Sequence, residues 1–299
     1  MSQDSIQSKI PVCPAPDANL KAPKLALPTG AIDTHAHVFG TQEKYPLSPN
    51  RGYTPWEASL EKLLEMHEAF GVERLVLTQP SVYGIDNSAM LDAIAKYPDR
   101  IRGVVAVGPE VTDQELEEFH AQGVRGIRVN LVDKGGMPFA SIKEFCDFAE
   151  RIKPFGWHLE LLIHVHEFPD LRDTLGKLPV DISVGHLGYM KTSEGINHPG
   201  FQDFINLVRD GHCWVKLTGT YRITTCDRTP YLDVAPVAQA LIEANQDRML
   251  WGTDWPHVAT YGFMPNDADL LDHMLDWTSD RAIQQKIFVD NPVNLYGFD

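Results

Sequence analysis

The chain alternates between short β-rich runs and longer helical runs eight times, and this alternation constrains its fold more than any other feature. The expected strands are Ala31–His37, Arg74–Gln79, Ile101–Val107, Val124–Asn130, His158–His164, Asp181–His186, Cys213–Thr218 and Arg248–Asp254. The expected helices are Pro55–Phe70, Asn87–Tyr97, Asp113–Gln122, Ser141–Lys153, Pro169–Leu175, Pro199–Arg209, Tyr231–Ala244 and a region from Asp267 onward. Strict alternation indicates parallel strands joined by helical crossovers. Eight such units predict a single (β/α)8 TIM barrel.

The chain divides into two segments of different composition. Residues 1–30 are rich in Pro, Lys, Ala and Ser, and their prolines disfavour regular structure, so we expect an extended N-terminal arm. Residues 31–299 contain no linker and are expected to form the barrel as one domain. Met1–Lys9 are polar and lack the apolar core of an export signal, which predicts a cytoplasmic protein.

Composition favours an enzyme with a sizeable core. Hydrophobic residues make up 43% of the chain and charged residues 22%. A net charge of −15 disfavours binding to nucleic acid or to an anionic membrane, and no apolar run is long enough to span a bilayer. The four cysteines have no Cys-x-x-Cys spacing and are expected to be reduced. The composition is compatible with a homo-oligomer.

Ionisable side chains recur at the expected C-terminal ends of the strands, where a TIM barrel builds its active site. His35 and His37 are two residues apart, so their imidazoles project from the same face of the first strand. His164, His186 and Asp254 end the fifth, sixth and eighth strands. We assign the remaining histidines in helices or at strand starts to packing or solvent: His67, His120, His158 and His273.

The residue types at these strand ends suit the hydrolysis of an ester or lactone. This reaction needs a base that activates water and groups that stabilise the charge developing on the carbonyl oxygen. Asp254, an acceptor among imidazoles, is the natural base. His35, His37 and His186 would either hold a Lewis-acid metal or donate hydrogen bonds to the carbonyl.

Six segments resemble the amidohydrolase superfamily, and within it the branch of lactonases for 2-pyrone-4,6-dicarboxylate and 4-sulfomuconolactone. These segments are Ile32–Gly40, Gly84–Asn87, Arg125–Asn130, Gly185–Gly188, Trp251–His257 and Asp290–Pro292. The resemblance implies that Arg128 and Arg222 bind the carboxylates of a substrate and that Tyr53 belongs to the mouth of the site. Cations at the mouth would concentrate an anionic ligand there. The predicted substrate-binding residues are Arg128, Arg222, Tyr53, Lys134, Ser81 and Tyr83.

The resemblance leaves the metal open, because the superfamily contains both zinc-binding members and a metal-free pyrone lactonase. His164 occupies the strand position where metal-binding members carry a ligand, so we expect one divalent metal, Zn²⁺. The candidate ligands are His35, His37, His164, His186 and Asp254. The fourth strand offers no lysine as a bridging ligand, which disfavours a binuclear centre. A metal-free site with histidine donors is the alternative.

These observations predict a hydrolase acting on a small anionic lactone of bacterial aromatic-compound degradation, of the 4-sulfomuconolactone or 2-pyrone-4,6-dicarboxylate type. The enzyme alternatives are a sugar-acid lactonase, a lactone isomerase and a metal-dependent nonoxidative decarboxylase of the same superfamily. A catalytically inactive barrel that serves as a binding protein is disfavoured because Asp254 and the His-x-His pair are both present.

Overall fold

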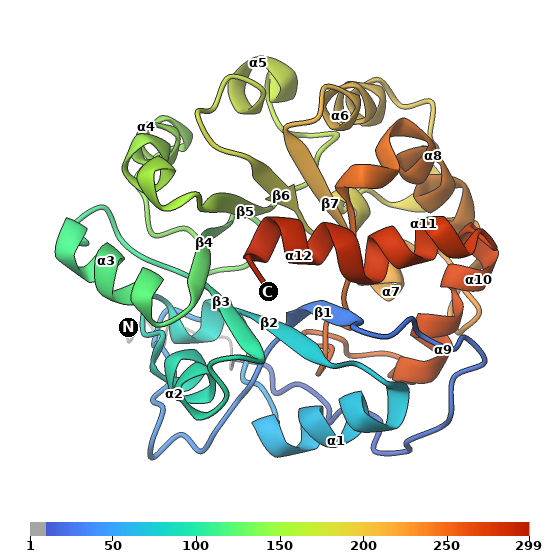
Figure 1. The fold of residues 1–299 in the computed structure, drawn as a ribbon, viewed down its shortest axis with the longest axis horizontal. Helices are drawn as coiled ribbons and strands as arrows, with labels where there is room; N and C mark the ends of the chain where they lie inside the picture. The colour runs from blue at the N-terminus through green and yellow to red at the C-terminus, as the bar shows by residue number, and fades with distance from the viewer. Residues whose placement is uncertain (1–9, 299) are drawn as a thin grey trace, which may run out of the picture.

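The computed structural model describes residues 10–298 and contains an eight-stranded parallel barrel surrounded by helices (Figure 1). The strands are β1 (Ile32–Ala36), β2 (Arg74–Thr78), β3 (Ile101–Val105), β4 (Val124–Asn130), β5 (His158–Leu162), β6 (Ile182–Val184), β7 (Cys213–Leu217) and β8 (Met249–Trp251). Each strand pairs with the next one in chain order, which confirms the predicted barrel. The prediction about Met1–Lys9 concerns residues outside the described range.

Helices follow the strands in turn and cover the outside of the barrel. Between the strands these are α1 (Leu60–Phe70), α2 (Ser88–Lys96), α3 (Asp113–Ala121), α4 (Ile142–Ile152), α5 (Leu171–Leu175), α6 (Pro199–Arg209), α7 (Thr220–Ile223) and α8 (Ala235–Asn245). After β8 come α9 (Asp267–Asp272), α10 (Met274–Trp277), α11 (Arg281–Gln285), the π-helical turn η7 (Lys286–Asp290) and α12 (Asn291–Tyr296). Short 3-10 turns are η1 (Ser81–Tyr83), η2 (Lys153–Phe155), η3 (His186–Gly188), η4 (Thr192–Glu194), η5 (Leu232–Val234) and η6 (Gln246–Arg248). Among residues 10–298, no helix has the length and apolar character needed to cross a membrane.

Two elements have bounds that differ from those expected from the sequence pattern. The first helix begins at Leu60 instead of Pro55, because the side chain of Ser59 accepts a hydrogen bond from the backbone N–H of Lys62. The eighth strand also ends earlier than expected, at Trp251, which leaves Asp254 in the loop that follows it. There Asp254 adopts a left-handed backbone with φ of 60°, a conformation that is uncommon for a residue other than glycine.

The barrel closes where β1 meets the residues after β8. The backbone N–H of Asp254 donates to the carbonyl of His35 at 2.8 Å, and the N–H of His37 donates to the carbonyl of Trp255 at 2.8 Å. Gly252 permits this approach, because a Cβ at its position would lie 2.8 Å from the Cβ of His35. Closure therefore brings the ends of the first and last strands together, although they are more than 200 residues apart in sequence.

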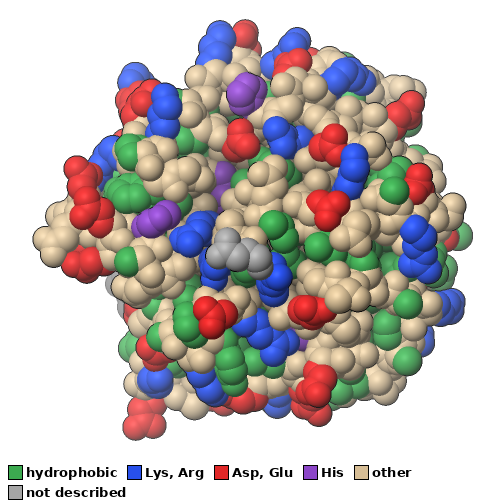
Figure 2. Space-filling model, viewed as in Figure 1, with side chains coloured by type: hydrophobic (Ala, Val, Ile, Leu, Met, Phe, Trp, Pro, Cys, Tyr) green, Lys and Arg blue, Asp and Glu red, His purple; other side chains and the backbone are tan. Residues whose placement is uncertain are grey.

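The C-terminal helix α12 lies across the base of the barrel, at the end where the strands begin (Figure 1). The ring of Tyr296 is fully buried and meets the ring of His158, the first residue of β5, edge to face. Arg74 and Arg102 lie over the ring of Phe298, and basic side chains gather near the centre of this face in Figure 2. The base is thus closed, so access to the strand ends is from the opposite side.

Residues 10–30 contain no helix or strand apart from a single bridge between Val12 and Thr54. Close to this bridge, the sulfur of Cys13 accepts a hydrogen bond from the backbone N–H of Ala259. Further along, the carboxylate of Asp272 in α9 accepts the backbone N–H groups of Lys24 and Leu25. This segment therefore connects the loops after β1 and β8 at the barrel mouth to the helices on its side.

Candidate active site

The end of β1 aims two imidazoles at the barrel mouth. His35 and His37 are buried, and their ring centroids lie 5.0 Å apart. The Nδ1 of His37 donates a hydrogen bond to the backbone carbonyl of Thr78 at 2.7 Å. Because a carbonyl oxygen only accepts, this bond places the proton of a neutral His37 ring on Nδ1 and leaves Nε2 as an acceptor that faces the site.

Asp254 lies at the centre of the cluster and is fully buried. One of its oxygens, Oδ2, accepts hydrogen bonds from the Tyr221 hydroxyl at 2.5 Å and from Nε of Arg222 at 2.8 Å. Burial alone would raise the pKa of the Asp254 carboxyl, but Arg222 and His186 outweigh it and hold the pKa well below its usual range. Asp254 is therefore a carboxylate at neutral pH and can accept a proton.

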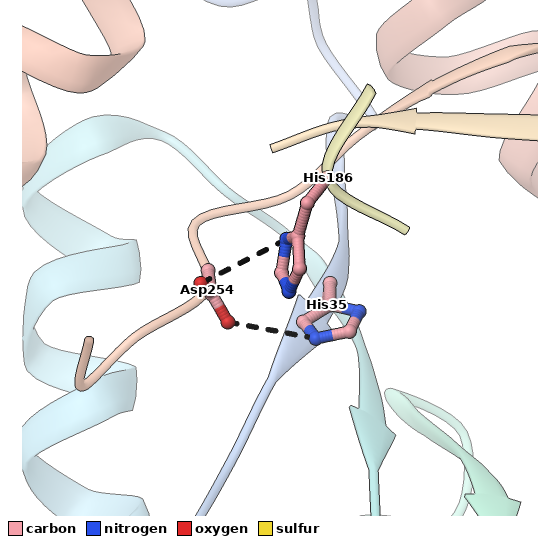
Figure 3. Close-up of side chains that lie close together, drawn as sticks. All are labelled: His35, His186 and Asp254. Carbon is pink, nitrogen blue, oxygen red and sulfur yellow. Dashed lines mark ion pairs between the residues drawn. The ribbon is translucent and has the colours of Figure 1, made fainter. Parts of the chain in front are cut away.

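Three buried atoms around Asp254 lack hydrogen-bond partners within the described part of the chain: Nε2 of His35, Nδ1 of His186 and Oδ1 of Asp254. Figure 3 shows these three side chains facing one another. Nε2 of His35 lies 3.5 Å from Oδ1, and Nδ1 of His186 lies 3.9 Å from Oδ2. Buried polar atoms are rarely left unpaired, so this group is arranged to meet a water molecule, a substrate oxygen or an ion.

The same three residues form the metal-ligand group found among residues 10–298, with ligand atoms all within 4.8 Å of one another. His164, predicted to be a ligand, lies outside this group. Its Nδ1 donates to the carbonyl of Tyr189 at 2.8 Å, and its ring stacks on the Tyr189 ring. Burial lowers the pKa of His186 to about 3, so His186 is neutral at physiological pH and keeps a lone pair on one ring nitrogen.

Arg128 is buried beside a small cavity at the ends of β2 and β4. Its side chain is only 6% exposed, and its Nε and Nη1 atoms have no hydrogen-bond partner among the described residues. The cavity is lined by Arg128, Ser81, Asn130, Gln79, Ile85 and neighbouring loop residues. The buried hydroxyl of Ser81 also lies at this cavity. An unpaired guanidinium is costly to bury, so this pocket suits an anionic group.

The other predicted substrate-binding residues have different surroundings. Arg222 is already engaged, because its Nη2 donates to the carbonyl of Val258 while its Nε binds Asp254. Tyr53 is buried, and burial raises the pKa of its phenol, which keeps it protonated. Lys134 is exposed on the loop after β4. Tyr83 packs against Phe39, with ring centroids 5.9 Å apart, and does not line the Arg128 cavity.

A buried ion pair below the imidazoles was not predicted to have a role. The ammonium of Lys216 forms a short contact with the carboxylate of Glu160, and both side chains are at most 2% exposed. Burial opposes ionisation of Glu160, but Lys216 and Arg128 outweigh it and lower the pKa of the carboxyl. The sequence did contain a signal for this pair. Each side chain is a charge within an otherwise apolar segment, Lys216 in Cys213–Leu217 and Glu160 in the four residues 159–162 that follow His158.

Asp33 is a second residue whose importance the sequence did not reveal. Its Oδ1 accepts the backbone N–H groups of His35 and Thr253, both at 3.0 Å. Its Oδ2 accepts the hydroxyl of Thr253 at 2.6 Å and Nε2 of His67 at 3.0 Å. Asp33 therefore ties the two strand ends that carry His35 and Asp254, and His67 supports it from α1.

Residues 32–298 match the family model described as amidohydrolase. The chain belongs to the amidohydrolase family. This amidohydrolase is 36% identical over 287 residues to a 2-pyrone-4,6-dicarboxylate hydrolase of Comamonas testosteroni, covering 93% of this chain and 94% of the relative. It is 37% identical over 297 residues to a 4-sulfomuconolactone hydrolase of Rhizobium radiobacter, covering 97% and 98%.

A solved structure adds a ligand-bound relative of this amidohydrolase. The crystal structure of a probable 2-pyrone-4,6-dicarboxylic acid hydrolase from Acinetobacter baumannii, with citric acid bound, superposes with a TM-score of 0.79 at 29% identity. The match covers 90% of this chain and all of the relative.

Proposed function

We propose that this amidohydrolase hydrolyses a small anionic lactone, of the 4-sulfomuconolactone or 2-pyrone-4,6-dicarboxylate type, in the bacterial degradation of aromatic compounds. The observation that carries the proposal is the buried guanidinium of Arg128, which has no hydrogen-bond partner in the described part of the chain and lies near His35 and His186. Relatives named for two anionic lactones and a relative with bound citric acid support the same substrate class.

In the proposed mechanism, Asp254 takes a proton from the water that attacks the lactone carbonyl. Oδ1 is the atom for this step, because Oδ2 is occupied by Tyr221 and Arg222. Those two bonds hold the carboxylate in one orientation. The imidazoles of His35 and His186 face the same space and would stabilise the oxygen that gains charge when the water attacks.

The charged group of the substrate would bind Arg128, whose free N–H groups suit the two oxygens of a carboxylate or a sulfonate. Ser81 adds a hydroxyl at the same cavity, and Tyr53 and Lys134 lie on the loops around it. In the free protein, Arg222 helps to hold the Asp254 carboxylate in its orientation. A second anionic group of the substrate would compete with Asp254 for its guanidinium.

A zinc ion, predicted from the sequence, is the second arrangement considered for this site. The ligand atoms of His35, His186 and Asp254 lie close enough to share one ion, and His37 has the hydrogen-bonded Nδ1 typical of ligating histidines. Such an ion would act as a Lewis acid on the carbonyl. His35 fits this role only when Nε2 carries a lone pair, and its contact with Lys216 favours the other tautomer.

The direct test is a panel of purified lactones scored by acid release at constant pH, with a neutral lactone of the same ring size as the matched control. We expect turnover of the dicarboxylate or sulfonate lactones and little turnover of the neutral one. A preference for neutral sugar lactones would indicate the sugar-acid lactonase or isomerase alternative, and release of CO₂ from an aromatic acid would indicate a decarboxylase. Either result would refute the proposed substrate class.

A further inference from the structure

The ammonium of Lys216 is surrounded by acceptors in the barrel interior. It lies 2.7 Å from the carbonyl oxygen of Thr34, 3.3 Å from Nδ1 of His35 and 3.5 Å from Oγ1 of Thr78, in addition to its short contact with Glu160. An ammonium has three N–H donors and no acceptor. Thr34 and Glu160 take two of them, and the third is directed to Nδ1 of His35, at the next shortest distance.

This contact decides which ring nitrogen of His35 carries the proton. While Nδ1 accepts from the ammonium of Lys216, the ring cannot be an imidazolium, so it is neutral and has one N–H. A nitrogen that accepts from Lys216 is not protonated, and the proton is then on Nε2. Nε2 is the buried, unpaired atom that faces Asp254.

Glu160 offers the competing arrangement. Its Oε1 lies 3.5 Å from Nδ1 of His35 and has no hydrogen-bond partner among the described residues. If Nδ1 donated to this oxygen, Nε2 would carry a lone pair instead of a proton. Lys216 and Glu160 thus favour opposite tautomers of one imidazole, and the lysine contact satisfies hydrogen-bond geometry whereas the glutamate contact does not.

We propose that Lys216 is a positioning residue that holds His35 as the tautomer with the proton on Nε2, so that His35 presents an N–H donor to the reacting carbonyl. The donation from His35 to a carbonyl rests on the proposed lactone hydrolysis, whereas the tautomer of His35 does not depend on that proposal. Glu160 is the counter-ion of the lysine. In this tautomer Nε2 has no lone pair for a metal ion.

The test is ¹H–¹⁵N correlation spectroscopy of histidine-labelled protein at neutral pH, in which the two nitrogens of each neutral tautomer have distinct shifts. The His35 signals are assigned by their absence in His35→Gln. We expect the Nε2–H tautomer in the wild type. In Lys216→Met we expect the Nδ1–H tautomer to become populated, because Oε1 of Glu160 then faces Nδ1 at 3.5 Å, the same distance that separates Nε2 from Oδ1 of Asp254.

Glu160→Gln is the matched control, because it breaks the same ion pair but keeps the lysine donor. It should retain the Nε2–H tautomer. Since Lys216→Met leaves a buried carboxylate unpaired, the double variant Lys216→Met/Glu160→Gln removes both charges of the pair; because Asp254 still faces Nε2, it should keep the Nε2–H tautomer. Turnover is measured on all variants, and we expect kcat to fall on the order of 10²-fold wherever the tautomer changes, with KM changed less than about 3-fold.

Two spectroscopic results would overturn the inference: a wild-type His35 protonated on Nδ1, or an unchanged Nε2–H tautomer in folded Lys216→Met. A change of tautomer with unchanged kcat would overturn the catalytic part of it. If the tautomers behave as expected but the wild type hydrolyses no lactone, the proposed function fails and the role of Lys216 in orienting His35 stands.

Discussion

Replacing Asp254 with asparagine should abolish turnover while leaving the protein folded. The geometry allows the amide to keep its oxygen at the Oδ2 position, where it still accepts from Tyr221 and Arg222. The –NH₂ group then replaces Oδ1, the atom that faces His35 and is free to accept a proton from water. The variant therefore removes the proposed base and keeps both contacts at the Oδ2 position, in weaker form.

The expected loss in kcat is ~10²–10⁴-fold, the usual contribution of a general base. This corresponds to about 3–5 kcal/mol of transition-state stabilisation. The two hydrogen bonds at Oδ2 become bonds to a neutral acceptor. They lose roughly 1–4 kcal/mol together, since charge-assisted bonds contribute ~1.5–3 kcal/mol and neutral ones about 1 kcal/mol. For a chain of this size that lowers Tm by a few degrees, on the order of 2–6 °C.

Initial rates are measured by acid release over a range of lactone concentrations, and Tm by circular dichroism on the same preparations. KM should change less than about 3-fold, because Arg128 and its cavity are untouched. If Asp254→Asn keeps more than about a tenth of the wild-type kcat, the base has been assigned to the wrong residue. A collapse of the fold would instead refute the claim that the amide preserves the Oδ2 contacts.

Four further outcomes follow from the same geometry. Arg128→Met should reduce kcat/KM for an anionic lactone by roughly 10- to 150-fold, the worth of a charged hydrogen bond, and should spare a neutral lactone; equal losses would make Arg128 structural. Asp33→Asn should lower Tm and kcat together, because two charge-assisted bonds that join β1 to the residues after β8 are weakened; a lower Tm with unchanged kcat would contradict its role in aligning the site. His186 has a pKa of about 3 in the folded protein and an ordinary value of 6.5 in the unfolded chain, so the unfolded chain binds a proton first as the pH decreases. Tm should therefore fall between pH 6.5 and pH 4, and His186→Gln should make this dependence of Tm on pH weaker. Finally, activity should survive dialysis against a strong chelator. If the protein instead loses about one equivalent of zinc and its activity together, the metal-bound arrangement is favoured.

The sequence predicted the barrel because each of its strands is an apolar run that a helical pattern follows, and such local patterns do not depend on distant contacts. It also placed His35, His37, His186 and Asp254 at one end of the barrel, since strand ends converge in this architecture. The position of His164 was not predictable in the same way. Its strand ends at Leu162, and the following turn directs its ring onto Tyr189.

Contacts between side chains of different loops or of distant strands also could not be predicted from the sequence. Arg222 was predicted to bind substrate, but whether it reaches Asp254 depends on how the loop after β7 folds over the mouth. The contact between Lys216 and Glu160 joins side chains of β5 and β7, which are not neighbours in the barrel. Such partners depend on interior packing, which periodicity does not specify.

The way residues 10–30 are attached has a practical consequence for immobilising the protein. Val12 pairs with Thr54 and Cys13 contacts Ala259, both in loops on the side of the barrel where the proposed substrate enters. The helix α12 and Phe298 lie at the opposite end, packed against the strand starts. A biosensor chip or affinity resin coupled through the C-terminal side would therefore hold the molecule with its entrance toward the solution.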